Sequence, residues 1–354
     1  MRLALITDTH WGVRNDNVAF MDNSKKFLNE VFFPYLNSNN VHTVVHLGDL
    51  VDRRKYININ TARRLREDFL DRLAHRELNV HMIAGNHDTY FKNTNSVNAL
   101  QEIVAEKYNF TIHDQIPREV EFDGTIILML PWICDENRKV CMERIKSTPA
   151  QIVMGHLELA GFEMYRGSIV SHGDDRSLFD RFDMVLSGHY HHRSSSGSIH
   201  YLGSHAEFTW SDYDDPRGFH VLDTETRELT FIENPYKMFA KVWYDDVTSG
   251  KEPESYDLSD LNSKMIKVIV TNKTDPYRFD MFINKLEKIG VLDMQVVEDH
   301  MNVNRQDDEM IINEAESTIS IFTKYLNTIN SPNLDKQKLE KTIIDLYQEA
   351  LTIE

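Results

Sequence analysis

The sequence predicts an α/β fold in which helices and strands alternate along the chain and pack in layers. Two observations lead to this prediction. Short apolar stretches typical of buried strands recur between segments whose apolar residues have helical spacing, from the N-terminus to about residue 110. These stretches also end in polar side chains, and functional groups collect at the carboxyl ends of strands in such folds.

Composition limits the classes of protein to consider. With 354 residues and 41% hydrophobic side chains, the chain can bury one large core or two to three smaller ones. No apolar run is long enough to cross a membrane, and residues 2–8 turn acidic too soon for a signal peptide. Two cysteines, Cys134 and Cys141, are too few for a disulfide framework, so we expect a cytoplasmic protein with no membrane partner.

The first half of the chain alternates regularly. We expect strands at residues 2–7, 41–47 and 79–84, and helices at residues 17–39 and 96–108. An arginine-rich helix follows residue 55. Each of the three strands is followed by polar groups, which are Asp8-Thr9-His10, Gly48-Asp49 and Gly85-Asn86-His87-Asp88.

The second half of the chain has a different pattern of expected strands and turns. Asp123-Gly124 is a strong hairpin signal between two short strands. Buried strands at residues 151–154 and 183–186 end in Gly155-His156 and in Gly188-His189-Tyr190-His191. Three further apolar stretches are expected to complete a second sheet, at residues 199–202, 219–222 and 229–232.

The chain divides near residue 235, where Glu233-Asn234-Pro235 interrupts the pattern. Residues 1–235 form the main domain, and residues 236–300 read as a small α/β cap. An acidic linker is expected at residues 301–310, followed by a helical tail at residues 311–354.

The polar strand ends together predict a metal site. They carry carboxylate, amide and imidazole donors without a thiolate, a mixture that suits manganese, iron, zinc or, less well, magnesium. Seven donors exceed the needs of one ion, and sharing Asp49 between two ions gives each four ligands. Such a pair, about 3.5–4 Å apart, is the arrangement for displacement at phosphorus. The seven are Asp8, His10, Asp49, Asn86, His156, His189 and His191.

Other residues near these strand ends are candidates for catalysis and substrate binding. His87 follows a ligand and should face the substrate, where it could stabilise the transition state or protonate the leaving oxygen. Asp52 is its expected partner. The basic run Arg53-Arg54-Lys55 could contact a DNA backbone, although a solvated surface explains it equally well. The net charge of −17 excludes non-specific wrapping of nucleic acid but not a DNA substrate held at bound dications.

The ordered set of strand-end motifs over residues 1–235 resembles the calcineurin-like metallophosphoesterases, which have a layered α/β/β/α sandwich. Within them the chain is similar to SbcD-type nuclease subunits of double-strand-break repair, including the phage recombination type. The further motifs that carry this likeness are Gly48-Asp49-Leu50-Val51-Asp52, Pro131-Trp132, Gly155-His156-Leu157-Glu158-Leu159, Gly161-Phe162, Gly188-His189 and Asp215-Pro216-Arg217-Gly218-Phe219.

The resemblance implies how the ligands divide. One ion would lie on Asp8, His10, Asp49 and His191, and the other on Asp49, Asn86, His156 and His189. It also implies His87 as the catalytic histidine and manganese as the metal, with magnesium as the alternative.

The resemblance further implies a 3′→5′ exonuclease on double-stranded DNA and an endonuclease on single strands, acting in DNA replication, recombination and repair. The cap would bind DNA. The helical tail would bind an SMC-like ABC-type ATPase, with two copies of this chain in a heterotetramer. Two alternatives remain: a phosphomonoesterase such as a protein Ser/Thr phosphatase, and a catalytically silent scaffold.

Overall fold

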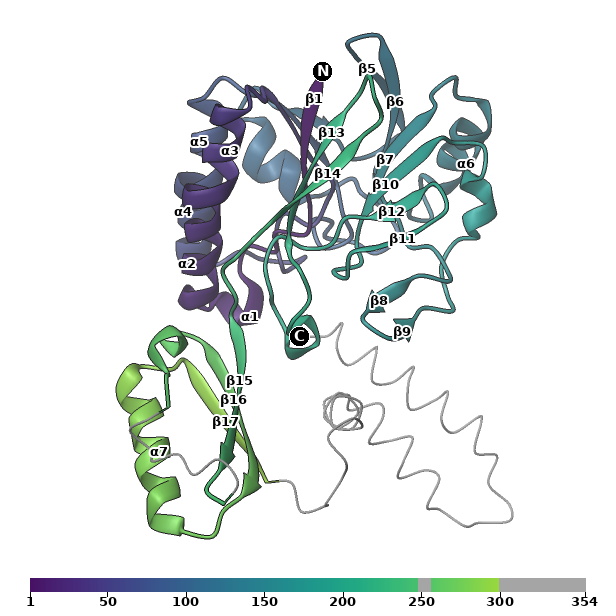
Figure 1. Cartoon of the computed structure of the whole chain (residues 1–354). Helices are drawn as coiled ribbons and strands as arrows, with labels where there is room; N and C mark the ends of the chain where they lie inside the picture. The colour runs from purple at the N-terminus through teal and green to yellow at the C-terminus, as the bar shows by residue number, and fades with distance from the viewer. Residues whose placement is uncertain (248–255, 299–354) are drawn as a thin grey trace, which may run out of the picture.

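The computed structural model describes residues 1–247 and 256–298. The expected acidic linker at residues 301–310 and helical tail at residues 311–354 lie outside the described residues. Figure 1 shows a larger body, in which two sheets face each other between helices, and a smaller module below it. The structure therefore has the layered α/β architecture that the sequence predicts.

The first sheet has six strands, of which β1, β2, β3 and β4 run parallel to one another. Its order is β14 (Leu229–Glu233), β13 (Gly218–Asp223), β1 (Arg2–Ile6), β2 (Thr43–His46), β3 (Asn79–Ile83) and β4 (Thr111–His113).

The placement of β13 and β14 corrects one expectation. Residues 219–222 and 229–232 join the first sheet, where β13 pairs antiparallel with β1, and not the second. Phe219 packs on Phe32 from the helical layer, with ring centroids 4.9 Å apart. The apolar pattern of these strands fits either sheet, so the sequence could not distinguish them.

The second sheet also has six strands. Its order is β11 (Ser194–Ser196), β12 (Ile199–Tyr201), β10 (Met184–Gly188), β7 (Ile152–His156), β6 (Thr125–Leu130) and β5 (Arg118–Phe122). The strands β12, β10, β7 and β6 run parallel, and the hairpin expected at Asp123-Gly124 joins β5 to β6. A separate short hairpin consists of β8 (Glu163–Tyr165) and β9 (Ser168–Ile169).

Helices cover the outer face of each sheet (Figure 1). On the first sheet a continuous helical stretch comprises α2 (Val18–Phe27), a π-helical turn (Leu28–Phe32) and α3 (Phe33–Ser38), matching the predicted helix. A second stretch comprises α4 (Ile59–Leu65), a π-helical turn (Arg66–Leu70) and α5 (Asp71–Ala74). The short helix α1 spans Val13–Asp16, and α6 (Arg138–Ser147) lies on the second sheet. The helix expected at residues 96–108 is shorter, with a π-helical segment at Leu100–Ala105, because Asn98 pairs with Thr89 instead.

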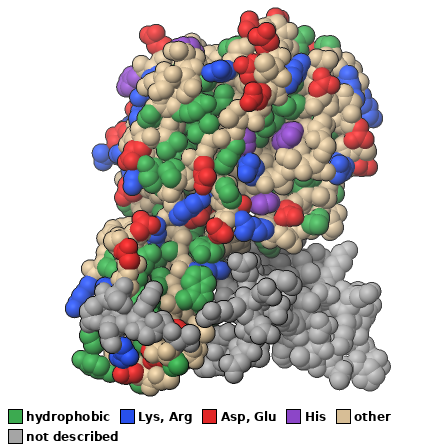
Figure 2. Space-filling model, viewed as in Figure 1, with side chains coloured by type: hydrophobic (Ala, Val, Ile, Leu, Met, Phe, Trp, Pro, Cys, Tyr) green, Lys and Arg blue, Asp and Glu red, His purple; other side chains and the backbone are tan. Residues whose placement is uncertain are grey.

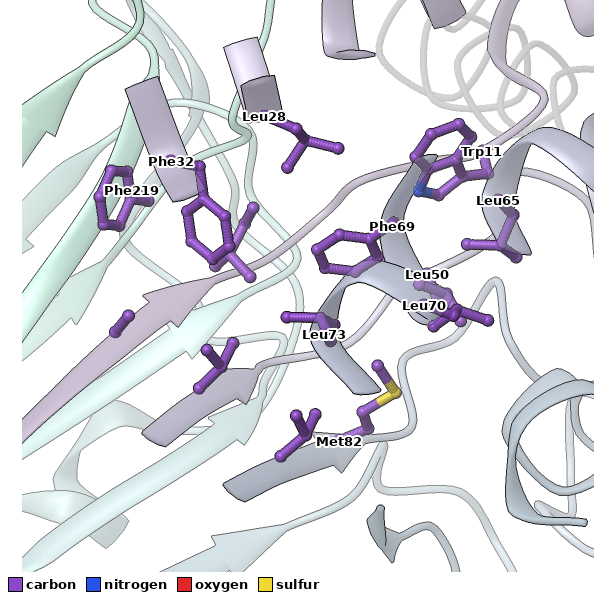
Figure 3. Close-up of a cluster of buried hydrophobic side chains, with 14 of the residues drawn as sticks. Trp11, Leu28, Phe32, Leu50, Leu65, Phe69, Leu70, Leu73, Met82 and Phe219 are labelled. Carbon is purple, nitrogen blue, oxygen red and sulfur yellow. The ribbon is translucent and has the colours of Figure 1, made fainter. Parts of the chain in front are cut away.

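Three hydrophobic cores follow from the layers. Between the sheets lie alternate residues of the strands, such as Leu5 and Met154. Under the helices, Phe32, Phe69 and Met82 belong to the largest cluster, which Figure 3 shows. A third cluster packs beneath α6. Alternate strand residues enter opposite cores, so each sheet is buried on both faces and holds its strand ends rigidly.

The predicted cap is a small parallel sheet with one helix. The strands are β15 (Phe239–Asp245), β16 (Met265–Asn272) and β17 (Asp293–Glu298), and α7 (Pro276–Ile289) packs on them. At the junction with the larger body, the Glu207 carboxylate accepts backbone hydrogen bonds from Met238 (2.7 Å) and Phe239 (3.1 Å). Within the described ranges, no helix is both long and apolar enough to cross a membrane.

Candidate metal centre

Five strand ends meet at one edge of the two facing sheets. The loops after β1 and β2 are joined by backbone hydrogen bonds, for example from the Asp8 N–H to Gly48 O (3.0 Å), and the Asp49 and Asp88 carboxylates tie the loop after β3 to the loop after β2. The second sheet contributes the ends of β7 and β10, which run parallel with Gly188 opposite His156. His156 bridges the sheets directly, because its Nδ1 lies 2.8 Å from the carbonyl oxygen of Leu47.

One cluster consists of Asp8, His10 and His191, whose ligand atoms lie within 4.8 Å of one another. Nε2 of His10 lies 3.0 Å from Nε2 of His191 and 4.0 Å from Oδ1 of Asp8. Two imidazole nitrogens at this distance need a proton or a cation between them. The three residues therefore face a common point.

A second cluster consists of Asn86, His156 and His189. Oδ1 of Asn86 lies 3.0 Å from Nε2 of His156 and 3.0 Å from Nδ1 of His189. Asp49 is grouped with the same two histidines.

Asp49 lies between the two clusters. Its Oδ2 is 3.7 Å from Nε2 of His10 and 3.3 Å from Nε2 of His156. Its Oδ1 accepts a hydrogen bond from the His87 N–H (2.8 Å), which fixes the carboxylate. The fold thus brings all seven candidate ligands together around one shared aspartate, and the oxygen and nitrogen donors fit two divalent cations.

The electrostatics suit cation binding. Although burial opposes it, His156 and His87 hold the pKa of Asp49 well below its usual range. Burial lowers the pKa of His189 to about 3, so its imidazole is neutral, the form that binds metal. His10 and His156 have pKa values raised to about 9, against burial, by hydrogen bonds and charges of the aspartates. Cations entering the site would displace those protons.

Several ligands have strained backbones. Asp8 (φ 50°), His10 (φ 41°), Asp49 (φ 55°) and His189 (φ 88°) all lie in the left-handed region, which costs non-glycine residues about 1–3 kcal/mol each. Such strain persists only where surrounding structure imposes it, and it clusters at functional sites.

Two glycines allow the loops to approach. Gly48 has φ 103°, and a Cβ there would lie 2.3 Å from Nδ1 of His156. A Cβ on Gly85 would lie 2.2 Å from Oδ1 of Asp49. Both positions require glycine because the ligands pack directly on the backbone.

His87 forms its ring hydrogen bond with the backbone of Asp52. Nδ1 of His87 donates to the backbone carbonyl of Asp52 at 2.5 Å, whereas the Asp52 carboxylate lies 3.4 Å from Nδ1 of His10. A carboxylate oxygen of Asp52 and one ring nitrogen each of His10 and His87 nevertheless lie within 4.8 Å of one another. The expected pairing of the Asp52 carboxylate with His87 stays a prediction.

The basic run separates into three environments. Arg53 donates to Asp16 (2.8 Å) and Asn15 (2.6 Å). Arg54 is partly buried, and its Nη1 is buried without a hydrogen-bond partner in the described structure. Burial lowers the pKa of Arg54, and the charge of Asp49 opposes that shift. Lys55 is exposed.

Two supporting carboxylates carried no assigned role in the sequence. Buried Asp88 accepts hydrogen bonds from the backbone N–H groups of Leu50 (2.8 Å) and Gly85 (2.9 Å), which ties two ligand loops together. Glu158 lies 4.0 Å from Nε2 of His189. Both residues lie inside motifs that the sequence shows, but the sequence indicates no role for either.

Several known proteins are similar to this chain. Residues 1–193 match the family model described as calcineurin-like phosphoesterase. The chain is 32% identical over 355 residues to exonuclease subunit 1 of Enterobacteria phage T4, with 99% of each chain covered. It is 24% identical to the SbcD subunit of the nuclease SbcCD of Staphylococcus saprophyticus, covering 77% of this chain and 70% of that one. For the Staphylococcus epidermidis protein of the same name the identity is 23%, with 88% and 91% covered.

Proposed function

The chain belongs to the calcineurin-like phosphoesterase family, and on that premise we propose that it is a metal-dependent nuclease that hydrolyses phosphodiester bonds in DNA. The observation that carries the proposal is the position of the Asp49 carboxylate, 3.7 Å from Nε2 of His10 and 3.3 Å from Nε2 of His156. The end-to-end similarity to a phage exonuclease subunit supports DNA as the polymer.

Two divalent cations, manganese or alternatively magnesium, are part of this proposal. When bound, they would neutralise the phosphate charge and supply an activated water for attack at phosphorus. Asp49 would be shared between them. One would rest on Asp8, His10 and His191, and the other on Asn86, His156 and His189. The imidazole-rich donor set favours manganese over magnesium.

His87 would act on the substrate. Its Nδ1 proton is engaged by the Asp52 carbonyl, so Nε2 is the ring nitrogen free to exchange a proton. The His87 ring lies against His10, with centroids 4.9 Å apart, which places it beside the proposed metals. We assign it transfer of a proton to the leaving oxygen. The Asp52 carboxylate acts through His10 as a positioning residue.

Arg54 is the strongest candidate of the basic run for contacting a phosphate. It follows Asp49 by five positions, and its buried Nη1 lacks a partner among the described residues. A buried guanidinium donor without a partner costs free energy unless a ligand satisfies it, and a phosphodiester oxygen would do so. Arg53 is already paired with Asp16, and exposed Lys55 remains a secondary contact.

The charge distribution supports contact with DNA at a few local groups. Acidic and basic side chains are mixed over the face shown in Figure 2, without one dominant basic surface. At the junction with the larger body, Lys241 lies over Tyr213 (4.5 Å) and buried Lys267 over Trp210 (4.3 Å), contacts that hold the cap. Its DNA-binding role is part of the proposal.

The finer activities rest on the family resemblance and the names of the relatives. We propose 3′→5′ exonuclease activity on duplex DNA and endonuclease activity on single strands, in DNA replication, recombination and repair within the host cytoplasm. Because the relatives are named as subunits, we propose a partner subunit as well. It would be an SMC-like ATPase bound by residues 311–354, with two copies of this chain per complex.

Competing substrates test the central proposal. Purified chain loaded with Mn²⁺ is offered single-stranded circular DNA and, separately, an aryl phosphate monoester. The proposed nuclease cuts the circle, and an Asp49→Ala variant loses both bound metal and cutting because both ions lose a ligand. Efficient monoester hydrolysis with the circle intact would make the chain a phosphomonoesterase. Neither activity, with two ions bound, would make it a silent scaffold.

A further inference from the structure

Two neighbouring aromatic side chains, Tyr90 and Phe91, are exposed on the loop that follows Asn86 and His87. Their relative exposures are 41% and 45%, and their rings meet edge to face with centroids 4.7 Å apart. Val97, on the returning arm of the loop, is 40% exposed beside the Tyr90 backbone, whose N–H donates to Val97 O (2.9 Å). An exposed group of large apolar side chains next to a functional site marks a binding surface.

The base of this loop is rigid. The Asn95 side chain donates to the carbonyl oxygens of Asp114 and Trp132, both at 2.8 Å. Thr89 and Asn98 form a bridge across the base, and Asp88 fastens it to the loop after β2. Because the frame is already ordered, a ligand stacking on the rings would lose little free energy in ordering the protein.

The loop is also close to the candidate metal centre. The Thr89 hydroxyl donates to the carbonyl oxygen of Asn86 (3.1 Å). Three peptide units separate Tyr90 from His87, so their Cα atoms lie at most about 11 Å apart. Trp132, bonded to the loop through Asn95, has its ring centroid 5.3 Å from that of His189. The rings therefore lie within a few nucleotides of any phosphate held at the metals.

Building on the proposed nuclease function, we propose that Tyr90 and Phe91 form a stacking platform for an unpaired base adjacent to the scissile phosphate. Aromatic side chains hold single-stranded nucleic acid this way, because every base offers a flat π-face whatever its sequence. Within a duplex both faces of each base are covered by neighbours. The platform thus selects single strands and frayed ends, and exposed Lys92 beside it can meet the backbone.

The test couples a change in the protein to a change in the DNA. Single-stranded oligonucleotides carry one abasic site, moved by one position at a time across the mapped cleavage bond. At one position within about three nucleotides of that bond, the wild-type kcat/KM with Mn²⁺ should fall roughly 10-fold. The double variant Tyr90→Ala/Phe91→Ala should already be slower by that factor on intact DNA and indifferent to the abasic site.

Matched variants and a binding measurement make the result specific. Tyr90→Phe/Phe91→Tyr keeps both rings and should behave as wild type, as should Ile126→Ala, which removes an exposed apolar side chain (37%) near the start of β6. The double alanine variant should keep wild-type metal content and unfolding midpoint. In EDTA, wild-type chain should quench 2-aminopurine at the sensitive position, and the double variant should not.

The outcomes separate this inference from the nuclease proposal. Quenching by wild-type chain without any DNA cleavage would support the platform and overturn the nuclease function. Cleavage in which the protein and DNA changes reduce kcat/KM independently would overturn the platform alone. A double alanine variant that cleaves DNA and quenches 2-aminopurine as wild type does would also overturn the platform. That holds even if the variant has lost binding to another protein.

Discussion

Nδ1 of His87 donates its hydrogen bond to the backbone carbonyl oxygen of Asp52, at 2.5 Å. The carboxylate of Asp52 is left to His10, 3.4 Å from its Nδ1. We therefore assign the two residues different roles. On the proposed function, His87 would face the substrate, whereas the Asp52 carboxylate would hold His10 in its metal-binding orientation.

We therefore expect Asp52→Asn and His87→Ala to fail in different ways. His87→Ala should bind two Mn²⁺ ions per chain but cleave DNA about 10²- to 10⁴-fold more slowly, because proton transfer is lost. Asp52→Asn should lose about 10- to 100-fold in affinity for one ion, because His10 loses its orienting partner. Calorimetric Mn²⁺ titration and cleavage rates at saturating Mn²⁺ separate them. Wild-type metal affinity in Asp52→Asn with slow cleavage would return the carboxylate to His87.

Substitution of Gly85 should displace the Asp49 carboxylate although Asp49 itself is unchanged. The new methyl group of Gly85→Ala would meet Oδ1 of Asp49 at 2.2 Å, so the carboxylate must move. We expect loss of bound metal together with roughly 1–3 kcal/mol of stability from overpacking. Gly124→Ala is the control: its methyl group meets open space, though its φ of 80° costs about 1 kcal/mol. Metal analysis and urea unfolding should show metal loss only for Gly85→Ala.

Substitutions of Arg54 and Arg53 should have different effects, although the two residues are adjacent. Arg54→Ala should weaken binding of single-stranded DNA and flatten its dependence on salt by about 0.7 units of log–log slope, with little change in stability. Arg53→Ala breaks the 2.8 Å pair with Asp16 and should cost about 1 kcal/mol of stability with the salt slope unchanged. DNA-binding titrations at several salt concentrations, with the metal chelated, provide the measurement. Equal slopes for Arg54→Ala and wild type would contradict the phosphate contact.

The junction between the two modules should respond to pH through Glu207. Burial raises the pKa of this carboxyl to about 7, from an ordinary value of 4.5. The folded state therefore binds the Glu207 proton more tightly than the unfolded state does, so protonation of Glu207 stabilises the fold. This contribution to the free energy of unfolding is complete below pH 4.5. It is lost as the pH rises through 7.

Glu207→Gln mimics the protonated form and still offers an oxygen to the Met238 and Phe239 N–H groups. Relative to wild type, it should gain stability between pH 5 and pH 8, by at most about 3 kcal/mol. Urea unfolding of both proteins over this range measures the difference. Stability curves that stay parallel would show that Glu207 does not titrate in this range.

The sequence predicts the strand ends and the set of seven ligands, because polar groups after buried strands leave a clear pattern. It does not predict how Asp8 and His10 converge. Residues two apart point the same way in an extended strand, but Asp8 and His10 both have left-handed backbones. That conformation is imposed by hydrogen bonds to the loop after β2, such as His10 N–H to Asp49 O (3.1 Å), which are long-range contacts.

The sequence also does not predict which of several nearby polar groups form hydrogen bonds with each other. Asp52 and His87 are 35 positions apart, and only the loop path determines that a carbonyl and not a carboxylate reaches the ring. Arg53 is likewise paired with Asp16, which lies 37 positions away, whereas Nη1 of Arg54 has no hydrogen-bond partner among the described residues. A run of three basic residues gives no hint of that division.

His10 and His191 face each other across 181 positions of chain, and β1 is covered on one side by β13, which ends at Asp223. During translation, strands β1 to β4 would emerge with four of the seven candidate ligands and an open strand edge. A ribosome must therefore complete well over half of the chain before the pair of ions can be held. On the proposed function, products released before His191 would lack a ligand and could not cut the DNA of the cell that makes them.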